Sequence, residues 1–261
     1  MRRSASARAS FALAVFLCVS APPPVAAQQP PDPLLAAVDA LLNFDGDLAA
    51  QYTIAQKKPG GSESKTVAAI FRRDAKGQFL CIILEPEADK GKGYLRIDDT
   101  LWLYDPADRS FAFTSAKERF QNSNARNADF ARSTLARDYR IVKQETGMLG
   151  KFACRILDLE ATSDAVPFAR RRAWISEDNL PRKFEDRSLS GTLMRIVAMP
   201  TYQRVGARWL PVTVVIVDTL KSKVVNGKTE YEQTTIEIGK VSVKPLADSL
   251  YSKEYLERVS R

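Results

Sequence analysis

The sequence contains no histidine in 261 residues and only three cysteines. Without imidazole, Ser-His-Asp and Cys-His catalysis are excluded, as are the transition-metal sites commonly built on histidine. No glycine-rich loop opens a helix after a strand, so a phosphate cradle of the nucleotide-binding type is also missing. Basic runs interleaved with stacking aromatics are absent too, which sets nucleic-acid binding aside. We therefore expect a protein without metal, cofactor or nucleic acid.

One catalytic pattern does occur, because Ser62-Glu63-Ser64-Lys65 spells S-x-x-K. In acylating enzymes this pattern comes with S-D-N and K-T-G partners, which this chain lacks. It also lies in a predicted hairpin loop and not at the start of a helix. The adjacent acids Glu185 and Asp186 point to opposite faces of a strand and cannot share a substrate. The sequence therefore predicts that the protein is not an enzyme.

Long apolar runs are scarce as well, and the run Phe11–Val19 near the start is too short to cross a bilayer. It follows three arginines and precedes the small residues Val25-Ala26-Ala27, which is typical of a secretory signal peptide. We expect cleavage after residue 27 and one domain over residues 28–261. Lipidation at Cys18 is disfavoured, because Leu17 stands where a small residue is needed.

The expected mature chain retains two cysteines, Cys81 and Cys154, in an oxidising compartment. Both lie in predicted strands, and only their Cα distance decides whether they pair. A disulfide and two buried apolar thiols therefore both stay open. The formal charge is +8 for the whole chain. A basic excess of this kind favours docking to an acidic partner or anionic lipid, or is solvated surface.

Period-two runs between turn signals predict about a dozen antiparallel strands. We expect them over residues 48–57, 64–73, 78–85, 93–98, 100–104, 109–115, 139–146, 151–160, 168–177, 182–188, 192–203, 207–220 and 228–243. The unbroken apolar run in 78–85 predicts burial on both faces of that strand. Asp32 and Pro33 begin an amphipathic helix that ends near Gly46, and two further helices are expected over 127–138 and 248–258. The chain is thus predicted to be mainly β with a few helices.

Aromatic residues gather between Gly91 and Phe130, where no nucleophile is paired with a base. They form either the wall of a cavity for an apolar guest or ordinary sheet core, and the sequence leaves both open. Alternation along a strand allows only about half of its residues to face inward. The candidate lining residues of a ligand cavity are Trp102, Tyr104, Phe111, Phe113, Phe130 and Leu135.

Several short segments together carry a resemblance to a known family. They are Gly91–Arg96, Leu101–Pro106, Asn127–Phe130, Trp174–Ser176, Leu180–Lys183, Arg208–Pro211 and Asp248–Tyr251. In order and spacing they resemble the outer-membrane lipoprotein-sorting family of LolA-like periplasmic carriers. The resemblance implies an incomplete, strongly curved antiparallel β-barrel with helices covering its concave face.

The resemblance also implies a function. A LolA-like protein is a periplasmic carrier or chaperone that shields the acyl chains of lipoproteins, or another lipid, on their way to the outer membrane. An inner-membrane transporter and an outer-membrane acceptor are the implied partners. The alternative is a non-enzymatic periplasmic accessory or interaction protein of an envelope transporter that carries no lipid.

Two features set this chain apart from the pattern it resembles. Asn122-Ser123-Asn124 replaces the usual Gly/Ser-rich slot, and the polar residues Lys117-Glu118-Arg119 precede it. We therefore expect the fold of the family with a cargo of its own. A run of three arginines, 170–172, has two readings: cross-strand pairing with Glu185 and Asp186 on a solvated face, or an anchor for a lipid phosphate or acidic partner.

Overall fold

Strands joined by short turns make up most of the chain, as the period-two runs require. The computed structural model describes residues 30–97 and 100–260, so the expected signal peptide (residues 1–27) and Cys18 lie outside the described part. Within the described ranges the strands are β1 (Asp47–Lys57), β2 (Glu63–Arg73), β3 (Gln78–Glu85), β4 (Gly93–Ile97), β5 (Thr100–Asp105), β6 (Ser110–Thr114), β7 (Tyr139–Leu149), β8 (Phe152–Ala161), β9 (Arg170–Ser176), β10 (Pro181–Arg187), β11 (Leu193–Val205), β12 (Arg208–Val225) and β13 (Lys228–Ser242).

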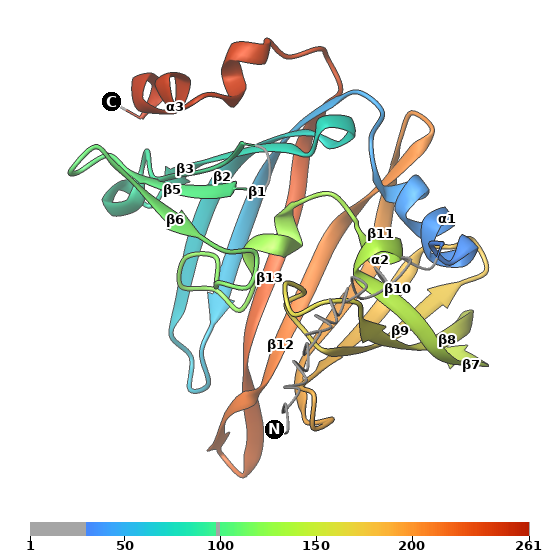
Figure 1. Cartoon of the computed structure of the whole chain (residues 1–261). Helices are drawn as coiled ribbons and strands as arrows, with labels where there is room; N and C mark the ends of the chain where they lie inside the picture. Colours follow the sequence, from blue (N-terminus) through green and yellow to red (C-terminus); the bar gives the residue numbers. More distant parts are fainter. Residues whose placement is uncertain (1–29, 98–99, 261) are drawn as a thin grey trace, which may run out of the picture. The chain divides into compact units, whose positions relative to one another are not determined.

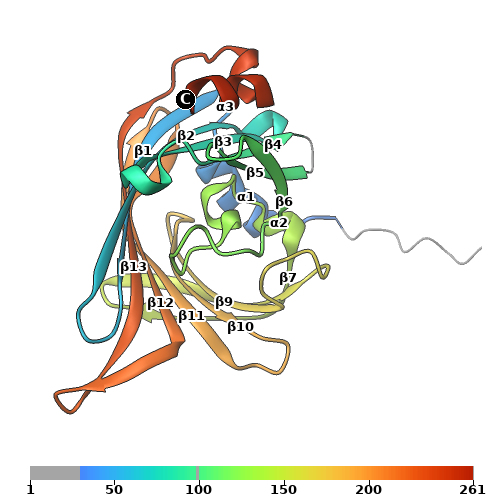
Figure 2. The same cartoon turned by 90° about the vertical axis from the view of Figure 1, so that its left-hand side faces the viewer.

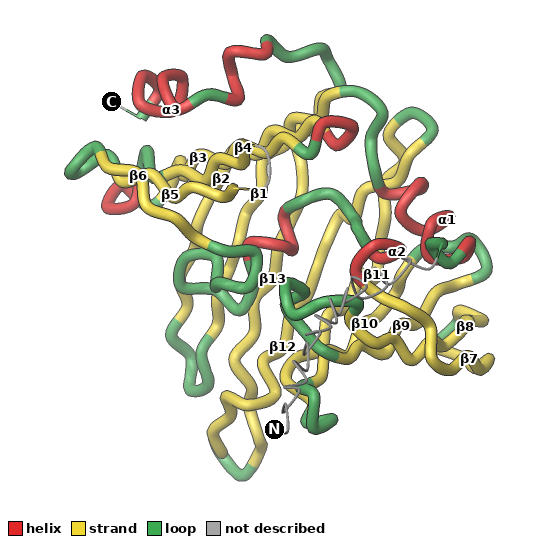
Figure 3. Tube along the Cα trace, viewed as in Figure 1, coloured by secondary structure: helices red, strands yellow, loops and turns green. Residues whose placement is uncertain are grey.

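Helices are few and short (Figure 3). The α-helices of the described ranges are α1 (Pro33–Leu42), α2 (Leu135–Asp138) and α3 (Lys253–Val259). Four short 3₁₀ helices accompany them: η1 (Asp74–Lys76), η2 (Glu87–Asp89), η3 (Asn127–Phe130) and η4 (Asp248–Tyr251). Asp32 caps α1 by accepting from the amides of Leu34 and Leu35, and Pro33 is the first helical residue, as predicted.

All thirteen described strands join one antiparallel sheet, in the order β6-β5-β4-β3-β2-β1-β13-β12-β11-β10-β9-β8-β7. Every neighbour is the next strand along the chain except for β1, which pairs with β13. The sheet bends strongly but does not close into a barrel (Figures 1 and 2). This confirms the predicted fold class, a mainly β chain with an incomplete, curved barrel.

The two edge strands, β6 and β7, follow each other in sequence but lie at opposite ends of the sheet. The chain between them, residues 115–138, therefore has to pass across the open side of the curve. We call these residues the crossing segment. It carries η3 and α2, and Figure 2 shows it together with α1 inside the curve of the sheet.

Apolar residues pack on both faces of the β2–β5 part of the sheet. On the concave face, Cys81 and Ile83 of β3 belong to the main core, which also contains Leu35 and Val38 of α1. On the convex face, Leu80 and Ile82 pack in a smaller cluster with the C-terminal segment that carries η4 and α3. The prediction that the strand over residues 78–85 is buried on both faces is thereby confirmed.

The predicted helix over residues 127–138 is wrong as a single element. It is divided into η3 and α2, because Ala131 is extended and because α1 determines where the second helix begins. The Asp39 carboxylate of α1 accepts hydrogen bonds from the amides of Leu135 and Ala136 at 2.9 Å each. The predicted closing helix is likewise divided, since Ser252 is extended and caps α3 by accepting from the Tyr255 amide.

Cys81 and Cys154 are both free, buried thiols. They lie on β3 and β8, with β2, β1, β13, β12, β11, β10 and β9 between those two strands in the sheet. Of the two possibilities that the sequence left open, the structure has the buried thiols. Burial raises the pKa of both groups, which keeps them protonated and unreactive near neutral pH.

The packing of α3 against the sheet can be tested at Gly93. A Cβ atom there would lie 2.5 Å from Leu256 Cδ1 and 3.0 Å from the Cys81 carbonyl oxygen. We expect Gly93→Ala to lower the free energy of unfolding by about 1–3 kcal/mol, the usual cost of overpacking. Urea unfolding measures this change.

Gly239→Ala on β13 is the matched control, because no heavy atom lies within 4 Å of its added Cβ. If the clash with Leu256 is the cause, adding Leu256→Ala to Gly93→Ala should give less than the sum of the two single losses. Equal losses for the two alanine variants of glycine would contradict this account of how α3 is seated.

Candidate ligand-binding site

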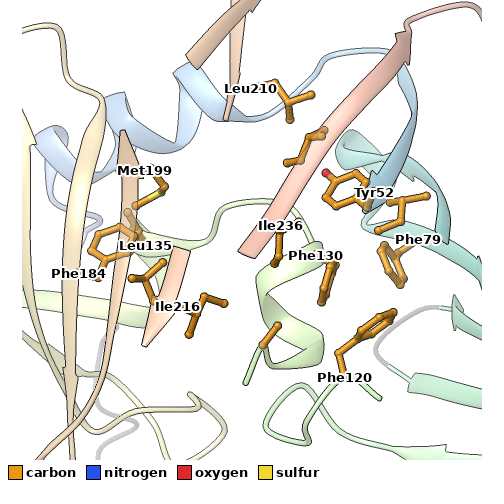
Figure 4. Packing of buried hydrophobic residues seen from close by; sticks show 14 of the residues in the cluster. Tyr52, Phe79, Phe120, Phe130, Leu135, Phe184, Met199, Leu210, Ile216 and Ile236 are labelled. Atoms are coloured by element: carbon orange, nitrogen blue, oxygen red, sulfur yellow. The ribbon is translucent and has the colours of Figure 1, made fainter. Parts of the chain in front are cut away.

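A cavity of about 200 Å³ lies at one end of the concave face, where α1 and the crossing segment meet the sheet. Its apolar wall comes from both: Leu42 of α1 and Leu135 of α2 face Phe184, Met199 and Leu210 of the sheet. Further apolar lining residues are Tyr52, Val166, Val197, Val214, Ile236 and Ile238. Figure 4 shows Leu135, Phe184, Met199 and Leu210 around this space. We call it the mouth cavity.

Much of the rest of the hollow is filled by the protein itself. Phe120 and Phe130 of the crossing segment lie inside the hollow near Tyr52 of β1 (Figure 4), and Phe120 also packs against Tyr94 of β4. The ring centroids of Phe120 and Phe130 are 4.3 Å apart, and those of Tyr94 and Phe120 are 4.8 Å apart. In this structure the crossing segment is therefore a plug, and the mouth cavity is a space that it leaves at one end.

A belt of polar side chains crosses the concave face beside the apolar rows. Each of six neighbouring strands contributes at least one member, and successive members are direct cross-strand partners, except between Thr234 and Glu232, which share β13. The members of this polar belt are Gln56, Thr234, Glu232, Asp218, Arg195, Asp186 and Arg171. All but Arg171 are less than a tenth exposed. Buried polar groups at such density require partners, and the belt supplies many of them internally.

Asp186 is the centre of the belt. Its carboxylate accepts from Arg171 Nε at 2.6 Å and from Arg195 Nε at 2.7 Å. Burial alone would raise the pKa of Asp186, but the two guanidinium groups outweigh burial and hold this pKa below its ordinary value. Against the effect of burial, Asp186 raises the pKa of Arg171, and Asp129 and Asp186, in that order, raise the pKa of Arg195. Asp186 is therefore ionised and forms a buried ion triad with two cations.

The polar belt also holds the crossing segment. Arg195 donates to both carboxylate oxygens of Asp129, at 2.7 and 2.8 Å. Arg119 donates to Asp218 at 2.7 Å, and the amide of Asn124 donates to Thr234 Oγ1 at 2.8 Å. These contacts satisfy polar groups of an irregular segment that would otherwise be buried without partners.

A second set of polar contacts holds the crossing segment at the mouth. Asp39 of α1 accepts from Ser133 Oγ at 2.6 Å in addition to the two amides of α2. Asn43 exchanges two hydrogen bonds with the Ser133 backbone, at 2.7 and 2.8 Å. Burial raises the pKa of Asp39, and its hydrogen bonds offset part of this rise. These hydrogen bonds hold α1 and α2 together over the mouth cavity, and we call them the polar clasp.

Four of the sequence-predicted lining residues lie on the other face of the sheet. Trp102, Tyr104 and Phe111 pack in the convex cluster beneath α3, where Lys253 Nζ lies 3.2 Å from the centre of the Trp102 ring. Phe113 stacks on Trp102 at 4.1 Å and is 74% exposed. The alternate residues of β5, Leu101 and Leu103, pack in the main core.

The other two predicted residues lie inside the hollow. Phe130 fills it next to Tyr52, with ring centroids 5.9 Å apart, and Leu135 lines the mouth cavity. Only Leu135 of the six is thus a wall residue of that cavity. Whether any of them contacts a ligand stays a prediction.

Sequence reasoning also missed most of the polar belt. The pairing of Arg171 with Asp186 is as predicted, but Arg171 faces the hollow and not solvent. Arg172 bonds to Glu145 and Asp158 instead of Glu185. The sequence does contain one signal of the polar belt. In each of the strands that carry Arg195 and Asp218, this charged residue interrupts a series of apolar residues at every second position.

Among residues 30–97 and 100–260, no three His, Cys, Asp or Glu side chains are grouped to hold a metal ion. Ser62 lies in the exposed β1–β2 turn, and Lys65 pairs with Glu85 at 3.6 Å on the surface. None of the helices in the described part is both long and apolar enough to cross a membrane.

Solved structures share this fold over nearly their whole length. A LolA superfamily protein of Nitrosomonas europaea has a TM-score of 0.71 at 18% identity and covers 85% of this chain and 97% of its own. A putative outer membrane lipoprotein-sorting protein domain of Vibrio parahaemolyticus has a TM-score of 0.75 at 17% identity and covers 86% of this chain and 97% of its own. A DUF1329 family protein of Desulfovibrio piger has a TM-score of 0.73 at 16% identity and covers 85% of this chain and 96% of its own.

These likenesses define the class: the fold is that of the LolA-like proteins, which confirms the predicted resemblance. A family profile described as an uncharacterized protein matches residues 75–258, and the chain belongs to that family. Comparison with curated proteins finds no match. The likenesses therefore establish the fold alone.

The buried triad makes acid stability a test of the polar belt. Asp186→Asn would leave two buried guanidinium groups without their shared anion, so we expect a loss of about 3–5 kcal/mol in unfolding free energy at pH 7. Because the pKa of Asp186 is lowered in the folded state, its contribution is present above about pH 4 and disappears as the pH falls through its folded pKa. Urea unfolding from pH 7 into the acid range measures both effects.

The variant should accordingly lose less stability on acidification than the wild type does. Glu160→Gln is the control, because that carboxylate forms ion pairs with the largely exposed Arg140 and Arg170 and should cost less than about 1 kcal/mol. An Asp186→Asn protein as stable as the control, with an unchanged pH profile, would show that the triad does not hold the sheet.

Proposed function

We propose that the protein is a periplasmic carrier that shelters the acyl chain of a lipoprotein or another lipid inside its curved sheet and helps to move it to the outer membrane. The crossing segment is the displaceable cover. Residues 1–27 serve as the signal peptide, and residues 28–261 form the carrier domain. An inner-membrane transporter and an outer-membrane acceptor are the expected partners. This function requires only binding and release of the ligand and no covalent step, so no catalytic residue is assigned.

The mouth cavity is the observation that supports this proposal most directly. Its wall is mostly apolar, and its cover consists of one turn of α2 and one side of α1. Polar contacts clasp that cover to its surroundings, and water replaces polar contacts at little net cost. A cover held in this way opens more easily than one held by a large apolar contact.

The volume of the mouth cavity and the free energies of burial show what opening of the cover has to provide. About 200 Å³ is less than the roughly 300–1,000 Å³ of common ligand sites, so an acyl chain needs more room than the closed state offers. Withdrawing Phe120 and Phe130 costs about 3–6 kcal/mol of apolar burial. A chain of some fifteen carbons regains on the order of 12 kcal/mol at about 0.8 kcal/mol per methylene. The surplus, about 6–9 kcal/mol, is available against the cost of association.

The plug itself favours a second candidate function. A hollow that Phe120 and Phe130 already fill is also what a non-enzymatic accessory protein of an envelope transporter needs, if it only binds its partner and carries no lipid. The two candidates differ in one measurable property, since only the carrier binds a free acyl chain.

A blocking substitution tests the carrier. Val214 lines the mouth cavity and is partly buried, so Val214→Trp should occupy the cavity without loss of the fold. We expect it to weaken binding of a fluorescent fatty acid about tenfold or more, which corresponds to about 1.4 kcal/mol. Val215→Trp on the opposite face of the same strand is the control and should bind as the wild type does.

Native mass spectrometry of the secreted wild-type protein complements this titration. A co-purified amphiphile agrees with the carrier. If the wild type neither retains an amphiphile nor binds the fatty acid, the carrier fails and the accessory protein becomes the better account.

The clasp gives a kinetic prediction. Asp39→Ala removes three hydrogen bonds that hold Ser133 and the first two residues of α2 to α1, so it should cost about 0.5–2 kcal/mol of stability, as the loss of a helix cap does. It should also speed fatty-acid uptake in stopped-flow experiments, because the cover opens more often. Asp45→Ala, which removes an exposed carboxylate near the end of the same helix, should leave the uptake rate unchanged. Slower or unaltered uptake in Asp39→Ala would argue against a displaceable cover.

A further inference from the structure

Two arginines of the crossing segment stand directly opposite each other. Residues 118–127 form a small hairpin, in which the Phe120 amide donates to the Ala125 carbonyl at 2.9 Å and the Asn127 amide donates to the Glu118 carbonyl at 3.0 Å. Arg119 and Arg126 are the bridged pair between these bonds. Like charges at directly opposed positions repel each other, so this arrangement needs compensation.

A third arginine adds to the positive charge. Arg195 of β11 lines the same small cavity of about 40 Å³ as Arg119 and Arg126. The guanidinium groups of Arg126 and Arg195 both lie over the Phe168 ring, at 5.8 and 4.4 Å from its centre. Three arginines thus line one pocket, together with Asp218, which is ion-paired with Arg119. We call this pocket the arginine pocket.

The carboxylates of the described residues do not balance these charges. Arg195 is bonded to Asp186 and Asp129, and Arg119 to Asp218. For the Arg126 guanidinium, the described part of the chain offers no ion pair. Burial, Arg195 and Arg119, in that order, lower the pKa of Arg126, and the carboxylates of Asp129 and Glu118 offset only part of this lowering. Within the described residues, the positive charge of Arg126 is therefore only partly compensated.

A residue that lines the same pocket has an unused hydrogen-bond donor. Asn124 lines it and is 3% exposed, yet its side-chain Nδ2 has no hydrogen-bond partner. The amide cannot be turned round to relieve this, because Arg119 donates to Asn124 Oδ1 at 3.0 Å and fixes its orientation. A buried N–H group without an acceptor is rare and indicates a missing ligand or water.

We propose that the arginine pocket binds a phosphate-type oxyanion, which Arg126 and Arg119 bind as cations and Asn124 Nδ2 binds as a hydrogen-bond donor. Three separate donor groups suit a tetrahedral anion with several oxygens, and guanidinium groups match phosphate geometry. One anion would supply both the missing charge and the missing acceptor.

The group that carries the phosphate has room to extend. A wider crevice of about 590 Å³ shares Phe168 and Met194 with the arginine pocket and is bordered by Lys117, Arg170 and Arg187. The phosphate can therefore belong to a soluble monoester or to the headgroup of an anionic lipid. Arg195 lies between this pocket and the mouth cavity, so the two sites are distinct and the proposal does not depend on acyl-chain binding.

The experiment compares thermal unfolding in sodium phosphate and in sodium chloride at matched ionic strength. We expect phosphate to raise the Tm of the wild type, since it binds the folded state. Arg126→Gln should have a higher Tm than the wild type in chloride, because the repulsion is relieved, and should lose the phosphate response. This opposite pair of changes cannot arise from a variant that merely folds badly. Titration calorimetry should show phosphate affinity weakened about tenfold or more.

Arg140→Gln is the matched control, because it removes the same charge from an exposed site on β7 and should keep the wild-type phosphate response. Co-sedimentation with phosphatidylcholine vesicles, with and without phosphatidylglycerol, separates the two sources of the phosphate. A response to inorganic phosphate supports a soluble ligand. Sedimentation that requires phosphatidylglycerol and that Arg126→Gln alone abolishes supports the headgroup. Neither response in the wild type, or responses that Arg126→Gln retains, would overturn the proposal.

Discussion

The pairing of β1 with β13 is the constraint from which the rest of the molecule follows. It joins the first and last strands at the middle of the sheet, so two strands adjacent in sequence, β6 and β7, become its opposite edges. The 115–138 connection must then cross the concave side. A long irregular connection carries many backbone polar groups into that interior, and such groups are stable there only with hydrogen-bond partners. Topology therefore makes both the plug and the need for polar groups on the concave face.

The polar belt meets that need at a cost in stability. Ions such as Asp186 and Arg195 lose hydration on burial, and apolar residues of similar size would stabilise the sheet as well or better. The polar groups nevertheless attach the crossing segment at fixed positions while only a few apolar side chains, chiefly Phe120 and Phe130, anchor it by burial. An attachment of this kind is specific in position and modest in strength, which are the properties that a displaceable cover requires.

Local sequence signals predicted the strands and turns well, because strand period and turn residues act over a few residues. They failed where distant residues decide. Asp39 divides the helix expected over residues 127–138 from a position about 100 residues away. The face of β5 was also undetermined: Trp102 and Tyr104 are as apolar as core residues, but α3 covers the convex face there and buries them on that side. Alternation shows which residues share a face, and only the tertiary fold shows which face is concave.

The residues that depart from the LolA-like sequence pattern lie where the crossing segment is attached to the sheet. Asn124 and Arg119, which replace or precede the usual small-residue slot, are the residues that join the crossing segment to Thr234 and Asp218. The bond to Thr234 comes from the Asn124 backbone amide, which glycine or serine would also supply, whereas the Arg119 guanidinium and the Asn124 side-chain amide are specific to these residues. Identities of 16–18% to solved structures establish the shared fold and leave the ligand to such differences. Arg119 and Asn124 both line the arginine pocket and neither lines the mouth cavity, so these departures act on the proposed oxyanion site and not on the apolar one.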